Sequence, residues 1–78
     1  MPQPAVEMRS LLVAALALPP AQRTAPTATE AAAKALRNIC PDASNEAIHA
    51  AIAEAVGALM TQLGPEAFMA ANAGLEVA

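Results

Sequence analysis

Aromatic side chains are almost missing from this 78-residue sequence: Phe68 is the only one. Cys40 and His49 are likewise the only cysteine and the only histidine. A single cysteine excludes a disulfide within the chain, and one cysteine with one histidine is too few for the usual four-ligand zinc site. We therefore expect no disulfide scaffold, no metal site and no bound cofactor.

Basic residues are also scarce, with four lysines and arginines against seven aspartates and glutamates and a net charge of −3. This balance argues against nucleic-acid binding, which needs clustered cations to replace the counterions of the phosphates. Residues 1–40 hold all four basic side chains, whereas residues 41–78 hold five acidic ones. The division favours head-to-tail association or a basic partner, although chance explains it equally well. The candidate acidic contact surface is Asp42, Glu46, Glu54 and Glu66.

Catalytic sequence motifs are missing as well: there is no phosphate-binding glycine loop, no GxSxG, no HExxH and no CxxC. His49 has no carboxylate four residues away to orient it as a general base, and we expect it to face solvent or an interface rim. Cys40 is expected to pack as a small apolar side chain, with a disulfide between two chains as the alternative. No pair of carboxylates is placed for acid–base work. The sequence therefore predicts a protein that is not an enzyme.

Long hydrophobic runs are absent too. The longest candidate, residues 11–18, is followed by Pro19 and Pro20, so it is too short to span a membrane. Pro4 and Glu7 do not fit the start of a secretory signal peptide. We expect a cytoplasmic protein or a component of a particle, and regard secretion as the less favoured alternative.

Alanine is what the chain has in abundance, with 23 of its 78 residues. Apolar residues recur at helical spacing between Ser44 and Gly64, which indicates a helix with one buried side. Phe68 and Met69 are expected to face inward from a following short helix. The predicted core or interface residues are Ile48, Ile52, Val56, Leu59, Leu63, Phe68 and Met69.

The prolines, glycines and capping residues that divide the chain predict an alanine-rich, all-α bundle of three to four helices. An extended start at residues 1–4 precedes a helix over 5–18 and a proline-rich, extended linker over 19–28. A helical core over 28–78 then contains helices at 28–39, 44–63 and 65–73. Thr27 and Glu30 form a capping box, and Gly64 is suited to end a helix.

A core this poor in large side chains is expected to gain stability from association with another protein. The first functional hypothesis is therefore a helical interaction subunit that self-associates or docks into a larger assembly. Its size and alanine bias favour a phage or bacterial source. The alternative is a small acidic inhibitor or anti-activator, of the phage anti-defence kind, that covers a surface of a host protein. No small-molecule substrate is evident.

Overall fold

Four α-helices and one short 3₁₀ turn make up the fold of residues 3–74, the part that the computed structural model describes. The helices are α1 (Pro4–Ala17), α2 (Ala28–Ile39), α3 (Asn45–Leu63) and α4 (Pro65–Ala73), and the 3₁₀ turn η1 is Pro20–Gln22. The prediction of a small all-α bundle is confirmed, and each helix begins and ends within one residue of its predicted range. The last residues of the predicted core, 75–78, lie outside the described part.

Local signals set the helix ends. The Thr27 hydroxyl accepts a hydrogen bond from the Glu30 backbone N–H at 3.1 Å, which caps α2 as its sequence predicts. The Ser44 hydroxyl caps α3 in the same way, by accepting from the Ala47 backbone N–H at 3.1 Å. Gly64 then ends α3 with a φ of 91°, a value that L side chains rarely adopt.

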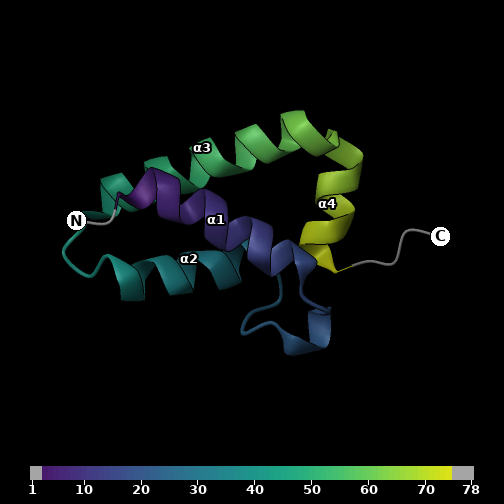
Figure 1. The fold of residues 1–78 in the computed structure, drawn as a ribbon, viewed down its shortest axis with the longest axis horizontal. Coiled ribbons are helices and arrows are strands. Elements are labelled where there is room, and N and C mark those ends of the chain that lie inside the picture. Colours follow the sequence, from purple (N-terminus) through teal and green to yellow (C-terminus); the bar gives the residue numbers. More distant parts are fainter. Residues whose placement is uncertain (1–2, 75–78) are drawn as a thin grey trace.

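The helices are arranged so that α1 lies against both α2 and α3, while α4 closes the end of the molecule away from the N-terminus (Figure 1). α1 and α3 both run toward α4 (Figure 1). α2, which lies between them in the sequence, runs in the opposite direction. The molecule measures 41 × 25 × 16 Å. One side of α1 stays uncovered, since Val6 and Val13 on it are 61% and 51% exposed.

The core combines a few large side chains with many alanines. Met8 and Leu12 of α1 are fully buried, so α1 belongs to the same core as the helices that follow it. The buried residues of the described chain are Met8, Leu12, Ala15, Ala28, Ala32, Leu36, Cys40, Ile48, Ala51, Ala55, Leu59 and Phe68. Alanines at helix contacts leave room for neighbouring backbones to approach closely, but each adds little buried area.

The buried stripe of α3 differs from the predicted one. Ile48 and Leu59 are buried as expected, but Ala51 and Ala55 lie between them where Ile52 and Val56 were predicted. The reason is that α1 packs against α3. Small residues occupy that contact, and the larger Ile52 and Val56 are only half-buried at its edge.

Two further residues of the predicted core or interface set, Leu63 and Met69, are not in the core. Leu63 is 48% exposed, because the chain turns by 119° between α3 and α4 and the end of α3 is left uncovered. Met69 is 60% exposed, although the adjacent Phe68 is buried. Consecutive helical residues point about 100° apart, and α4 covers the core with the side that carries Phe68.

The segments before and after α1 also differ from the extended segments that the sequence predicts. Gln3 is extended, but Pro4 is already the first residue of α1, a position at which its missing N–H costs nothing. Met1 and Pro2 lie outside the described residues. In the linker, Pro20–Gln22 forms the η1 turn instead of a polyproline segment. The linker therefore folds back as a compact loop, seen below α1 in Figure 1.

Candidate functional site

The best-organised polar group of the molecule surrounds Arg23 in this linker. Its Nε donates to the Ala15 carbonyl at 3.1 Å, at the end of α1. Its Nη1 and Nη2 donate to the carbonyls of Asn72 and Ala71 at 3.2 and 2.9 Å, at the end of α4. A guanidinium is well matched to the negative ends of two helix dipoles. Arg23 therefore joins three segments, and this role is structural.

Asn72 forms the second part of the same junction. Its side-chain Oδ1 accepts from the Thr29 backbone N–H at 2.8 Å and from the Thr29 hydroxyl at 2.7 Å. It thus caps the first turn of α2 from 43 residues away along the chain. The capping-box sequence gives no sign of this second cap, since the acceptor comes from another helix.

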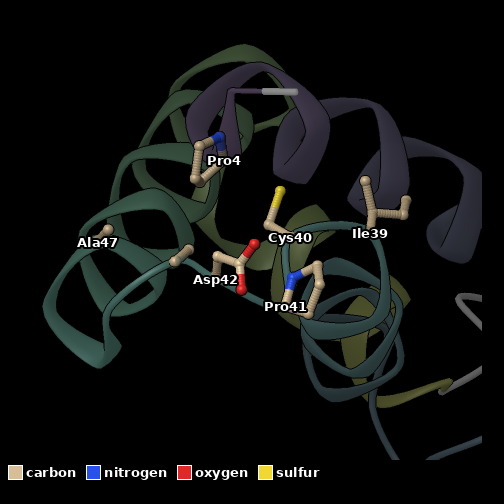
Figure 2. A pocket seen from close by; sticks show the side chains of 7 residues that line it. Pro4, Ile39, Cys40, Pro41, Asp42 and Ala47 are labelled. Atoms are coloured by element: carbon tan, nitrogen blue, oxygen red, sulfur yellow. The ribbon is translucent and has the colours of Figure 1, made fainter. Parts of the chain in front are cut away.

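A hollow of about 370 Å³ lies beside Cys40, and Figure 2 shows the residues around it. It lies between the start of α1 and the turn that joins α2 to α3. Cys40 is 8% exposed, and its sulfur points toward the space between Pro4 and Ile39 (Figure 2). The lining is Pro4, Ile39, Cys40, Pro41, Asp42, Ala43 and Ala47. The only ionisable side chains in that lining are the Cys40 thiol and the Asp42 carboxylate.

His49 and the four candidate acidic residues all lie on the surface of the described chain. His49 is exposed on α3. Within residues 3–74 no group of three histidine, cysteine or acidic side chains is close enough to hold a metal ion. The candidate acidic residues Asp42, Glu46, Glu54 and Glu66 are all exposed.

The four candidate acidic residues do not gather on one patch. Asp42 and Glu46 lie at the start of α3, and Glu66 lies in the first turn of α4, beyond the far end of α3. α3 has 19 residues and is therefore about 28 Å long. A separation of this size exceeds the Debye length of about 8 Å at physiological ionic strength, so the charges do not act as a single site.

Exposed hydrophobic side chains are the clearest feature of the surface. Six large ones are exposed among the described residues: Val6, Val13, Leu18, Ile39, Leu63 and Met69. The core holds the same number of large ones, with Cys40 and five alanines filling the rest of it. Val6, Val13, Leu18 and Ile39 are not among the residues predicted from the sequence. Val6 and Val13 lie on α1, which is apolar on more than one side, and Leu18 and Ile39 lie at the ends of α1 and α2.

No single helix in residues 3–74 is long and apolar enough to cross a membrane. α3 and α4 meet that requirement only when taken together, and they are bent by 119° relative to each other. Comparisons of the chain with protein-family models, with curated proteins and with solved structures gave no match.

Proposed function

We propose that this chain is a small helical subunit that acts through protein–protein contacts, by associating with itself or by docking into a larger assembly. One observation supports this above all: the described chain exposes as many large hydrophobic side chains as it buries. Exposed apolar surface gains free energy when a partner covers it, by roughly 25 cal/mol per Å². Association would also add to an alanine-rich core that supplies little stability alone.

The proposal places the protein in the cytoplasm or in a particle of phage or bacterial origin. The support is compositional: a short chain, a high alanine content and few cations. It has no enzymatic activity in this proposal, since the described side chains do not assemble a nucleophile, a base and an orienting group. Nor does it bind nucleic acid, because its basic residues are few.

The test is the native mass of the purified chain over a dilution series, with helicity followed by circular dichroism. A helical oligomer that dissociates on dilution is the expected result for self-association. A chain that is unfolded alone and gains helicity with its assembly partner is the expected result for docking. A folded chain that stays monomeric at every concentration contradicts self-association.

The alternative is a small acidic inhibitor that covers a basic surface of another protein. Exposure of Asp42, Glu46, Glu54 and Glu66 supports it, while their spread along α3 and α4 counts against a single contact patch. This alternative requires a folded monomer whose binding to a basic protein weakens steeply as salt is added.

A further inference from the structure

The open side of α1 is the most unusual apolar surface of the molecule. Val6 and Val13 lie seven residues apart, hence on the same side of the helix, and are 61% and 51% exposed. Met8 and Leu12 on the opposite side are fully buried. A helix that is apolar on both sides is normally buried on both sides. We call Val6 and Val13 the valine face.

A groove of about 200 Å³ separates this valine face from α3. Its lining comes from α1 and α3 and consists of Ala5, Val6, Arg9, Ser10, Glu54 and Ala55. Arg9 and Glu54 are both exposed and lie on opposite banks of the groove, one on each helix. In the lining of this groove the α1 side carries a positive charge, Arg9, and the α3 side carries a negative charge, Glu54. We call them the positive side and the negative side of the groove.

The negative side is covered by small residues. Ala50, Ala53 and Gly57 are exposed around Glu54 on α3. A Cβ atom built on Gly57 would have nothing within 4 Å, so no neighbour among residues 3–74 requires a glycine there. Glycine inside a helix costs roughly 0.5–1 kcal/mol relative to alanine. A surface without side-chain bulk lets another helix approach closely.

We propose that the partner for this surface is a second copy of the same chain, docked about a two-fold axis that runs along the groove. Rotation about such an axis places the α1 side of one copy against the α3 side of the other. Arg9 then meets Glu54 of the second copy, and this pairing occurs twice. The valine face packs onto the small residues around Gly57. The inference rests on the proposed function and specifies its partner.

The size of the surface sets the expected strength. α1 has 14 residues and is about 21 Å long, and two packed helices lie about 8–10 Å apart. Such a face is at the small end of specific interfaces, which gives weak, reversible association. Sedimentation velocity over a concentration series detects association of this kind.

Charge reversal tests the arrangement. Arg9→Glu and Glu54→Arg each put like charges opposite one another, and each is expected to weaken dimerisation about tenfold or more. The double variant restores both pairs with their signs exchanged and is expected to recover most of the affinity. Arg37→Glu is the control, because it makes the same charge change as Arg9→Glu at an exposed position on α2. Failure of the double variant to recover affinity contradicts the pairing.

Gly57→Leu tests the close approach separately. The variant gains about 0.8–1 kcal/mol of helix propensity, and the space around Gly57 accepts the side chain. The monomer should therefore become more stable to urea while the dimer is lost. Asn38→Leu, at an exposed position of α2, is the control and should leave the dimer intact.

The outcomes separate this inference from the proposed function. An oligomer that none of these substitutions weakens overturns the two-fold contact and leaves self-association standing. A wild-type chain that is a folded monomer up to millimolar concentration overturns the two-fold contact and self-association together, and leaves docking into a larger assembly as the proposed function.

Discussion

The guanidinium of Arg23 donates from Nη2 to the carbonyl of Ala71 at 2.9 Å, across 48 residues of sequence. With its two other hydrogen bonds, this contact ties the linker to the ends of α1 and α4. A segment rich in proline and threonine is thereby given one conformation. The junction fixes the end of α4 beside the start of α2, where Asn72 can cap it.

Arg23→Ala is expected to lower the free energy of unfolding by about 2–3 kcal/mol, because three carbonyls lose a charged donor. Arg23→Lys keeps the charge without the forked geometry and should recover only part of the loss. Urea unfolding followed by circular dichroism measures both. Equal stability of Arg23→Ala and the wild type would show that the junction does not hold the linker.

Asn72→Ala removes the acceptor for the Thr29 backbone and hydroxyl groups, and is expected to cost about 1–2 kcal/mol. Asn38→Ala is the matched control, because it makes the same change at an exposed position on α2. Its cost should stay below about 0.5 kcal/mol. Hydrogen exchange of the Thr29 amide should also quicken in Asn72→Ala alone.

The glycines of the chain are predicted to respond to alanine with opposite signs. Gly57→Ala should stabilise the monomer by about 0.5–1 kcal/mol. Gly74→Ala should destabilise it by about 1–3 kcal/mol, because φ is +74° and the new Cβ would lie 2.8 Å from Pro20 Cγ. Thermal unfolding at a protein concentration too low for dimerisation compares the two variants. A stabilising Gly74→Ala would contradict the position of Pro20 beside Gly74.

The corrected stripe of α3 makes a distinct prediction. Ala55→Asp places a carboxylate in the fully buried contact with α1 and should cost more than about 3 kcal/mol. Val56 is half-buried, so Val56→Asp should lower the free energy of unfolding clearly less, although Val56 is the larger residue. Circular dichroism and native mass rank the two variants. A more damaging Val56→Asp would restore the stripe that the sequence predicts.

Cys40 is expected to be a slow thiol. Because it is 8% exposed, a water-soluble thiol reagent should label it about tenfold or more slowly in the native chain than in urea. A disulfide between copies should form slowly for the same reason. Labelling at the same rate in both states would mean that the hollow beside Cys40 opens readily.

The sequence by itself determined the helices and their ends, because those depend on residues close together in the chain. Thr27 and Ser44 cap the turns that follow them, and Gly64 supplies a positive φ where α3 stops. Periodicity also identified Ile48, Leu59 and Phe68 as buried. In an alanine-rich helix, however, small residues are equally suited to core and surface, so local spacing did not show that Ala51 and Ala55 are buried in place of Ile52 and Val56.

Only the tertiary structure decided where α1 lies and which sides of the helices are covered. Ala51 and Ala55 are buried because α1 packs against α3, and Val6 and Val13 are exposed because no other part of the described chain covers that side of α1. Arg23 and Asn72 acquire their roles from carbonyl and amide groups more than 40 residues distant. Contacts between residues so far apart in the sequence form only when whole helices pack together. The spacing of residues within one helix therefore does not predict them.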